Sequence, residues 1–354
     1  MRGLEEWLPF EDALATAVGR ASPDPTWLAP LLSAESDDAQ RLREAADGVR
    51  RRFVGDEVHL RALVEITSYC CRNCMYCGLR RDHTSQPRYR MSPSEVVALA
   101  RQAASIGYRT VVLQGGEDPC LDRETVARIL SDIKASTDLA VTLSLGERSY
   151  DAYARWREEG ADRYLLRIET TDPALFASVH PDGNLRRRMQ CLEDLKRLGY
   201  QLGTGVLVGL PGQTALSTAD DVIWMRDLGA EMLGVGPFIP NPDTPLADTP
   251  GGALDQALNL VAVLRLVFPN AHIPATTALG ALDPMGGEKG LKAGANVLMP
   301  NLTPRTQRES YALYPGKPIV DITSATCRDA IVARIEAIGR RVAADHGHVH
   351  RLTE

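Results

Sequence analysis

The sequence contains no long hydrophobic run and no strong excess of charge of either sign. None of its apolar segments approaches the roughly 20 residues that a helix needs to span a bilayer, and residues 1–7 lack the apolar core of a secretory signal peptide. The formal net charge of −6 is mild, so neither nucleic acid nor an anionic membrane is indicated as a partner. We therefore expect a cytoplasmic protein.

Cysteine is scarce and unevenly distributed, which argues against a disulfide framework. The chain has 7 cysteines, and four of them lie between Cys70 and Cys77. A chain of 354 residues buries a sufficient core without disulfides, and thiols this close in sequence would form strained bridges. Cys120, Cys191 and Cys327 are isolated, so we expect ordinary neutral thiols there. The clustered thiols indicate a metal centre in a reducing compartment.

The signatures of common nucleotide-binding folds are also missing. No Walker sequence is present, and Gly203, Gly205 and Gly209 miss the dinucleotide-binding spacing and lie within a predicted strand. Alternating histidines at 346, 348 and 350 are interpreted as a polar tail rather than a metal site.

The spacing within the cysteine cluster distinguishes three kinds of metal centre. Cys71-x2-Cys74-x2-Cys77 matches the start of a ferredoxin run, but no fourth cysteine followed by proline is nearby. Zinc could take all four thiolates, although adjacent Cys70 and Cys71 point in different directions and rarely complete one tetrahedron. The third option is Cys70-x3-Cys74-x2-Cys77 with the aromatic Tyr76 before the last thiolate. This pattern resembles the radical S-adenosylmethionine (SAM) enzymes.

In radical SAM enzymes, three thiolates hold three irons of a 4Fe–4S cluster, and the open fourth iron chelates the amino and carboxylate groups of SAM. A closed cluster only moves electrons, whereas an open iron can bind and reduce a substrate. The resemblance therefore implies one 4Fe–4S cluster and SAM as cofactors, with Cys70, Cys74 and Cys77 as the metal ligands. We expect Cys71 not to contact the cluster.

From Leu63 onward, short apolar runs rich in β-branched residues alternate with longer amphipathic stretches. This alternation predicts right-handed crossovers and a parallel sheet. Eight units suit a closed α/β barrel of the (β/α)8 or TIM type, with an open doubly wound sheet as the alternative. The predicted strands are Leu63–Thr67, Thr110–Gln114, Ala140–Leu145, Arg163–Arg167, Leu202–Val208, Met232–Gly236, His272–Thr276 and Ala295–Met299. The predicted helices are Pro93–Ser105, Thr125–Ala135, Tyr150–Glu159, Leu185–Leu198, Ala219–Leu228, Leu254–Phe268 and Gly286–Ala293.

Three regions are predicted along the chain. Residues 1–58 are polar and helical, and we interpret them as an N-terminal helical cap over one end of the barrel. Residues 59–340 form the barrel, and residues 341–354 form a C-terminal tail.

In a barrel, functional residues are expected where strands end and loops begin. The cysteines follow the first predicted strand, Gly115-Gly116-Glu117 follows the second, and Ser144 ends the third. Glycines let backbone carbonyls approach a ligand closely, and the ammonium of SAM needs acceptors. Paired glycines also mark ordinary turns, but this position in a radical SAM pattern favours a cofactor role.

The fourth predicted strand ends in charged residues. Arg167 and Glu169 alternate and so face the same side, which fits either a structural ion pair or a ligand contact. We predict that Glu169 accepts from a ribose hydroxyl or the ammonium of SAM, while Arg188 pairs with the SAM carboxylate. The predicted cofactor-binding residues are Tyr76, Gly115, Gly116, Glu117, Ser144, Glu169 and Arg188.

A second group of residues lies near the ends of inward-facing predicted strands. Arg163, Thr276 and Thr277 could bind an anion, or a substrate that bears cyanide or carboxylate, and Met299 is expected to line the barrel. We therefore predict a substrate cavity lined by these four residues.

Segments beyond the cysteines resemble one family, the radical SAM maturases of iron–iron hydrogenase (the HydE family). The resemblance covers roughly residues 58–340. Its clearest segments are Gly78-Leu79-Arg80-Arg81-Asp82, Thr142-Leu143-Ser144-Leu145-Gly146-Glu147, Val208-Gly209-Leu210-Pro211-Gly212-Gln213-Thr214, Ile273-Pro274-Ala275-Thr276-Thr277-Ala278 and Tyr314-Pro315-Gly316-Lys317. It implies a full barrel with cluster and SAM at its top, a long internal cavity, and an anion site in that cavity at Arg163, Thr276 and Thr277.

The same resemblance implies a function. SAM would be cleaved reductively to methionine and a 5′-deoxyadenosyl radical, which would act in assembly of the diiron site of the hydrogenase H-cluster. The implied substrate is a small cysteine-bound iron–carbonyl–cyanide compound. The implied partners are other hydrogenase maturases and an external one-electron reductant.

Two departures from the family pattern matter. The segment Thr323-Ser324-Ala325-Thr326-Cys327-Arg328 keeps only Cys327 of a cysteine triplet that often holds an auxiliary cluster, so we predict no second cluster. Ile168 also replaces a common histidine, which indicates a diverged member.

Two other functions compete with the maturase. A related enzyme of the methylornithine synthase or biotin synthase type has the same barrel, although biotin synthase needs a second cluster for which no cysteine set is present. A non-catalytic iron–sulfur scaffold is disfavoured because it needs no SAM pocket, whereas Gly115-Gly116-Glu117, Glu169 and Arg188 are intact.

Overall fold

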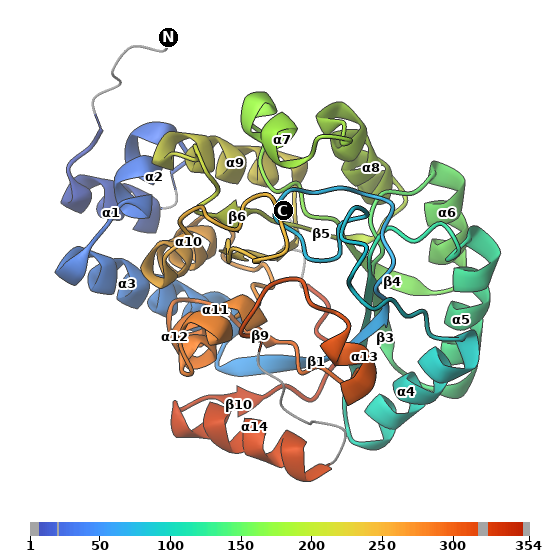
Figure 1. Ribbon diagram of the computed structural model, residues 1–354. Helices are drawn as coiled ribbons and strands as arrows, with labels where there is room; N and C mark the ends of the chain where they lie inside the picture. Colours follow the sequence, from blue (N-terminus) through green and yellow to red (C-terminus); the bar gives the residue numbers. More distant parts are fainter. Residues whose placement is uncertain (1–6, 20, 318–324, 350–354) are drawn as a thin grey trace.

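Parallel strands form the centre of the protein and helices surround them, as the computed structural model shows (Figure 1). The structure describes residues 7–19, 21–317 and 325–349. Hydrogen bonds join six strands in order, and β9 and β10 pair with the free edge of β1. These strands are β1 (Glu57–Thr67), β2 (Thr110–Gly115), β3 (Ala140–Ser144), β4 (Ala161–Leu165), β5 (Gln201–Thr204), β7 (Met232–Leu233), β9 (Val297–Leu298) and β10 (Arg341–Val342).

Isolated bridges close the ring of strands. His272 bridges Met232 of β7, Pro274 bridges Val297 of β9, and β9 pairs with β1. The ring is complete and every pairing in it is parallel, which confirms the predicted barrel. The seventh predicted strand, His272–Thr276, is reduced to these bridges because Pro274 has no N–H for a regular ladder.

The fifth and sixth predicted strands are each divided in two. The second halves are β6 (Leu207–Val208) and β8 (Gly236–Pro237), which pair as a separate two-stranded sheet. Between the halves, Gly205 approaches Gly234 so closely that a Cβ on Gly205 would overlap the carbonyl of Gly234. This close backbone approach interrupts the ladder.

The helices begin and end close to the bounds that hydrophobic periodicity predicts. The predicted ones are α4 (Pro93–Ser105), α5 (Arg123–Ser136), α6 (Tyr150–Glu158), α8 (Leu185–Arg197), α9 (Ala215–Leu228), α10 (Leu254–Val267) and α12 (Gly286–Lys292). For α4 the cause is local: Ser92 and Glu95 form a reciprocal capping box, and Pro93 occupies the first turn. Four further helices are α7 (Pro173–Val179), α11 (Thr277–Leu282), α13 (Arg305–Glu309) and α14 (Ala325–Ala337). Among the helices described, none is both long and apolar enough to cross a membrane.

The N-terminal helices α1 (Phe10–Val18), α2 (Pro25–Leu32) and α3 (Ser36–Val54) lie beside α9 and α10 (Figure 1). Asn259 of α10 donates its side-chain N–H to the carbonyl of Ala34 at 2.7 Å, and Arg43 of α3 pairs with Asp255 of α10 at 2.8 Å. The segment is helical as predicted, but it lies against the side of the barrel rather than across one end.

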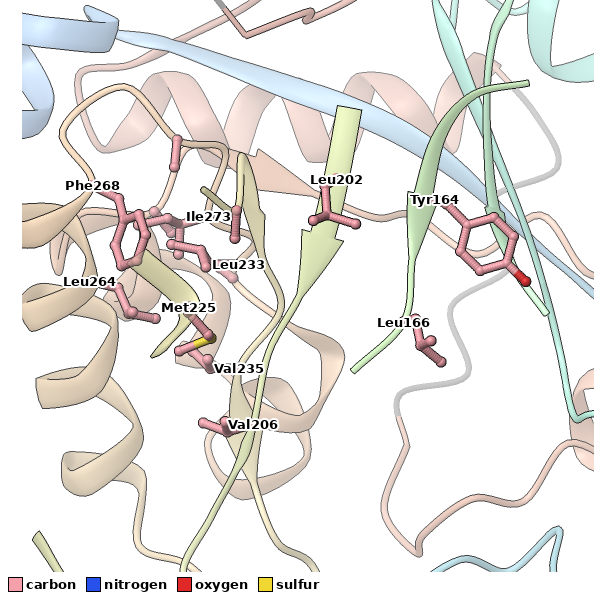
Figure 2. Packing of buried hydrophobic residues seen from close by; sticks show 14 of the residues in the cluster. Tyr164, Leu166, Leu202, Val206, Met225, Leu233, Val235, Leu264, Phe268 and Ile273 are labelled. Atoms are coloured by element: carbon pink, nitrogen blue, oxygen red, sulfur yellow. The ribbon is translucent and has the colours of Figure 1, made fainter. Parts of the chain in front are cut away.

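The hydrophobic core lies between strands and helices, not inside the barrel. Figure 2 shows side chains of Leu202 and Leu233 from the strands with Met225 of α9 and Leu264 of α10, all of them buried. Strand residues alternate between the two sides, so the neighbouring positions point inward, where they leave room for a cavity.

The C-terminal segment closes the end of the barrel at which the strands begin. β10 pairs with the start of β1, and the chain then reaches Arg163, whose Nη2 donates to the carbonyls of His346 (2.6 Å) and Gly347 (2.9 Å). Residues 341–349 are therefore part of the barrel rather than a separate tail. The remainder of that predicted tail, including His350, lies outside the described residues.

A buried carboxyl on α9 predicts an unusual pH dependence of stability. Asp221 accepts from the backbone N–H (2.5 Å) and hydroxyl (2.7 Å) of Thr171, and burial raises the pKa of Asp221 to about 7. Because the folded-state pKa exceeds the unfolded value, the resulting stabilisation is complete below about pH 4 and is lost as the pH rises through 7. Asp221→Asn, which keeps an acceptor for Thr171, should raise the free energy of unfolding at pH 8 by at most about 4 kcal/mol, and by less at pH 5.

Urea unfolding at the two pH values measures this effect. Asp132→Asn, at an exposed position on α5, is the matched control and should change little. Equal stabilisation by Asp221→Asn at pH 5 and pH 8 would contradict the assignment.

Candidate functional site

A cavity of about 340 Å³ runs from the cysteine loop into the barrel. Its deep wall includes Arg61, Met232 and His272, and its upper wall is built from residues at the carboxyl ends of the strands. Every predicted site residue except Arg163 lines this cavity. The strand-end positions chosen from the sequence are thus brought together in one place.

The cysteine loop follows β1 and presents three thiols to the cavity. Cys70, Cys74 and Cys77 line it, whereas Cys71 is exposed and does not. Burial raises the pKa of Cys77 to about 12, so its proton must leave when metal binds. In the described chain no three histidine, cysteine or carboxylate side chains converge on one metal ion. The separated thiols fit a 4Fe–4S cluster, in which each thiolate binds a different iron.

The glycine pair after β2 lies against the cysteine loop. A Cβ on Gly116 would lie 2.7 Å from Cβ of Cys70 and would overlap the carbonyl of Tyr69, and a Cβ on Gly115 would lie 2.7 Å from Cγ2 of Thr67. Glycine is required here because the two loops approach this closely. The predicted role of their carbonyls as acceptors for SAM stays a prediction.

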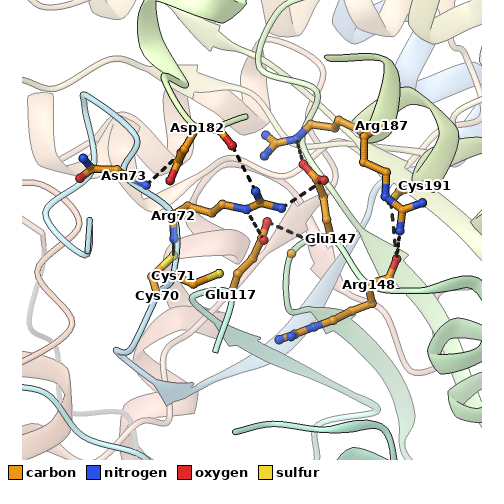
Figure 3. A network of polar contacts seen from close by, with 12 residues as sticks. Cys70, Cys71, Arg72, Asn73, Glu117, Glu147, Arg148, Asp182, Arg187 and Cys191 are labelled. Atoms are coloured by element: carbon orange, nitrogen blue, oxygen red, sulfur yellow. Dashed lines mark hydrogen bonds and ion pairs between the residues drawn. The ribbon is translucent and has the colours of Figure 1, made fainter. Parts of the chain in front are cut away.

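Glu117 is tied to an ionic network beside the thiols (Figure 3). Its carboxylate accepts from Arg72 Nε at 2.5 Å and from the backbone N–H of Glu147 at 3.0 Å. Glu147 in turn pairs with Arg72 at 3.3 Å and with Arg188 at 2.9 Å. The network joins the cysteine loop to α8 and orients Arg188 along the cavity wall. The sequence marks Glu147 only as part of a family segment, because its partners in space come from the cysteine loop, the turn after β2 and α8.

Arg167 and Glu169 face the same side, as their alternation predicts. Arg167 Nη2 lies 3.2 Å from Glu169 Oε2, yet this buried oxygen has no hydrogen bond in the described part of the chain. Burial raises the pKa of Glu169, and its φ of 66° is in the left-handed region, which non-glycine residues rarely adopt. A buried carboxylate beside the thiols, with a positive φ and one oxygen that makes no hydrogen bond in the described residues, fits a polar group of SAM.

Tyr76 is held by a residue that the sequence did not single out. Its hydroxyl lies 3.0 Å from His180 Nε2, and the two rings meet edge to face. Burial lowers the pKa of His180 to about 3, so at neutral pH the ring is uncharged and Nε2 can accept from the phenol.

The predicted substrate residues are divided between the two ends of the barrel. Thr276 donates to the carbonyl of Val235 at 3.0 Å, Thr277 hydrogen-bonds the hydroxyl of Tyr314 at 2.8 Å, and Met299 lines the cavity with them. The prediction for Arg163 is wrong. It lies in the middle of β4, where it is fully buried against the C-terminal segment. The guanidinium groups that line the cavity are those of Arg61, Arg72, Arg167 and Arg188.

Comparisons with known proteins agree with this geometry. The family model for the radical SAM superfamily matches residues 64–225. The [FeFe] hydrogenase maturase subunit HydE of Thermotoga maritima is 46% identical over 315 residues, which cover 89% of this chain and 90% of that protein. The 3-methylornithine synthase of Methanosarcina barkeri is 29% identical over 89% of each chain.

Solved structures show the same fold. The methylornithine synthase PylB superposes with a TM-score of 0.81 at 25% identity, covering 94% of this chain and 97% of that one. The [FeFe]-hydrogenase maturase HydG also gives a TM-score of 0.81, at 19% identity and over 95% of this chain and 77% of that one. Given the identity to HydE along nearly the whole length of both sequences, the chain belongs to the radical SAM superfamily and, within it, to the family of the [FeFe] hydrogenase maturase subunit HydE.

Proposed function

We propose that this radical SAM enzyme cleaves SAM reductively and acts in assembly of the diiron site of the [FeFe]-hydrogenase H-cluster. The observation that supports it best is the single cavity that begins at Cys70, Cys74 and Cys77 and continues into the barrel interior. It offers one space in which a SAM-derived radical and a second molecule can meet. The 46% identity to HydE supports the choice of reaction.

The three cysteines would hold the cluster, which when bound supplies one electron to the sulfonium of SAM. Glu169 would accept from the ribose or the ammonium of SAM, and Arg188, oriented by Glu147 at 2.9 Å, would face the carboxylate. Three further parts complete the proposed pocket: Ser144, the Gly115–Glu117 turn, and Tyr76, whose hydroxyl contacts His180.

The part of the cavity that the proposed SAM pocket leaves free would bind the substrate. It combines the cations Arg61 and Arg167 with the hydroxyls of Thr276 and Thr277, and Met299 adds apolar surface. This composition suits a small anionic compound such as a cysteine-bound iron–carbonyl–cyanide precursor. Partner maturases would supply that substrate and receive the product.

We also propose a single cluster and a cytoplasmic location. Cys327 lies on α14, far in sequence from any other cysteine, and it is the one cysteine of the segment 323–328. Residues 323 and 324 lie outside the described residues. A reconstituted protein should therefore contain about four irons per chain. The oxygen-sensitive cluster needs a reducing compartment.

The proposal is tested by anaerobic reconstitution with iron and sulfide, then addition of dithionite and SAM. We expect 5′-deoxyadenosine as a product and an EPR signal of one 4Fe–4S cluster that changes when SAM binds. A colourless protein that retains zinc, or a cluster indifferent to SAM, would leave only a metal-binding scaffold.

The likeness to methylornithine synthases, at 29% identity in sequence and a TM-score of 0.81 in structure, favours a second candidate, a carbon-skeleton mutase. Mass spectrometry of cells that express the chain distinguishes the two functions. Accumulation of 3-methylornithine supports the mutase, whereas rescue of hydrogenase activity in a strain lacking HydE supports the maturase.

A further inference from the structure

The surface beside the cysteine loop carries arginines that the proposed SAM chemistry does not use. We call Arg81, Arg148, Arg186 and Arg187 the basic rim. Arg81, Arg186 and Arg187 are exposed, and Arg148 is partly exposed. A concentration of cations at one place is notable in a chain whose net charge is −6.

Hydrogen bonds connect this rim to the cysteine loop. Arg81 Nη1 donates to the carbonyl of Cys71 at 3.1 Å. Figure 3 shows the second contact, in which Arg187 Nη2 donates to the carbonyl of Arg148 at 2.8 Å. Arg148 Nη2 reaches the carbonyl of Asp118 at 3.1 Å, next to the turn that packs on Cys70. Arg81 therefore lies on the cysteine loop itself, while Arg148 and Arg187 lie beside it, against the turn that packs on Cys70.

Three of the four rim arginines have no carboxylate partner in the described part of the chain. The buried carboxylates Glu117 and Glu147 are engaged by Arg72 and Arg188. In the described chain, Arg148 and Arg187 donate to backbone carbonyls, and no carboxylate pairs with them or with Arg186. Arg81 alone of the rim shares its charge, with Asp82 and Asp182.

An aromatic residue extends the same surface. Tyr69 precedes Cys70, is 41% exposed, and carries Arg90 over its ring at 4.5 Å. Arg90 pairs with Asp118 at 2.6 Å, which makes the surface continuous with Arg148. Exposed tyrosine and arginine are the residues enriched at protein interfaces. The basic rim and Tyr69 together therefore have the residue composition of a protein-binding surface, in addition to a positive charge.

We propose that the basic rim, with Tyr69 at its edge, is the docking surface for an acidic one-electron carrier protein. The proposal rests on the proposed function, because reductive SAM cleavage consumes one electron that must enter from outside. That electron leaves the reduced carrier and enters the cluster. Here the exposed Cys71 adjoins a predicted cluster ligand, so a protein seated on the rim comes close to the cluster while the cavity stays closed to it.

Binding of an acidic flavodoxin in its oxidised form, measured by titration calorimetry, tests the docking surface. Charge reversal in Arg186→Glu with Arg187→Glu should raise the Kd at least about tenfold at 50 mM salt, and Arg186→Gln with Arg187→Gln should have a smaller effect. The difference from wild type should shrink at 300 mM salt, where the charges are screened. The control variant combines Arg52→Glu with Arg109→Glu. These exposed arginines precede β1 and β2 at the opposite end of the barrel. The control makes the same charge change and should bind flavodoxin as tightly as wild type does.

The rate of 5′-deoxyadenosine formation without substrate provides the second measurement. With subsaturating reduced flavodoxin, the Glu double variant should be slowed by the same factor as its Kd rises. With dithionite, a small reductant that needs no docking, it should match wild type. The substrate is omitted because the rim arginines could also attract an anionic substrate. Without substrate, any loss of rate in the variant reflects electron delivery alone.

Unchanged flavodoxin binding by the Glu double variant would overturn the proposal, as would equal weakening by the control pair or an equal loss of rate with dithionite. If the wild-type chain forms no 5′-deoxyadenosine with either reductant, the proposed function fails instead. The calorimetric Kd still decides the docking surface in that case.

Discussion

Cys74→Ala is expected to abolish SAM cleavage, lowering 5′-deoxyadenosine formation by at least about 10³-fold. Cys74 lines the cavity between Cys70 and Cys77, and two thiolates do not hold three irons of a cluster. The variant should also bind much less iron and lose the EPR signal of the reduced cluster. Because the loop is supported by Arg72 and by Gly116, the fold itself should persist, and circular dichroism checks this.

Cys71→Ala is the matched control for that experiment. Cys71 adjoins a ligand position but is exposed and lies outside the cavity. The Cys71→Ala variant should keep the full iron content and most of the SAM-cleavage activity. Loss of the cluster in Cys71→Ala together with retention in Cys70→Ala would instead indicate the ferredoxin-like set of Cys71, Cys74 and Cys77.

Glu169→Gln is expected to raise the KM for SAM by about 10–100-fold, because a hydrogen bond to a charged group is worth about 1.5–3 kcal/mol. Its Oε2 is buried without a hydrogen bond in the described chain, and the amide replaces one acceptor by a donor. The steady-state KM and the SAM concentration needed to change the EPR signal both report the effect.

A purely structural role for Glu169 makes a different prediction. Loss of its pairing with Arg167, 3.2 Å away, would lower the melting temperature and leave the KM for SAM unchanged. Glu169→Asp keeps the charge but shortens the side chain, so it should fall between wild type and Glu169→Gln in KM. A KM for SAM unaltered in both variants would remove Glu169 from the proposed pocket.

Regular elements with strong local signals were predictable from the sequence. The capping box at Ser92 and Glu95 marks the start of α4. Runs of β-branched residues mark the strands, because strand preference depends on residues that are neighbours in the sequence. Interruptions were not predictable in the same way. The break between β5 and β6 arises where Gly205 meets Gly234, a contact between residues far apart in the chain.

The candidate site shows the same division. Cysteine spacing and the positions of strand ends identified the thiols, the glycine turn and Glu169, since carboxyl ends of parallel strands share one end of a barrel. The contact of His180 with Tyr76 carries no sequence pattern.

The sequence by itself determined the barrel, the set of thiols and the end of the barrel at which chemistry is expected. Only the tertiary structure decided which charged side chains reach the cavity. Arg163 and Arg167 are equally inward-facing by alternation, but Arg163 lies in the middle of β4 and is covered by His346 and Gly347, whereas Arg167 lies beyond the carboxyl end of the strand. That cover depends on the pairing of β10 with β1, a long-range contact that no local period encodes.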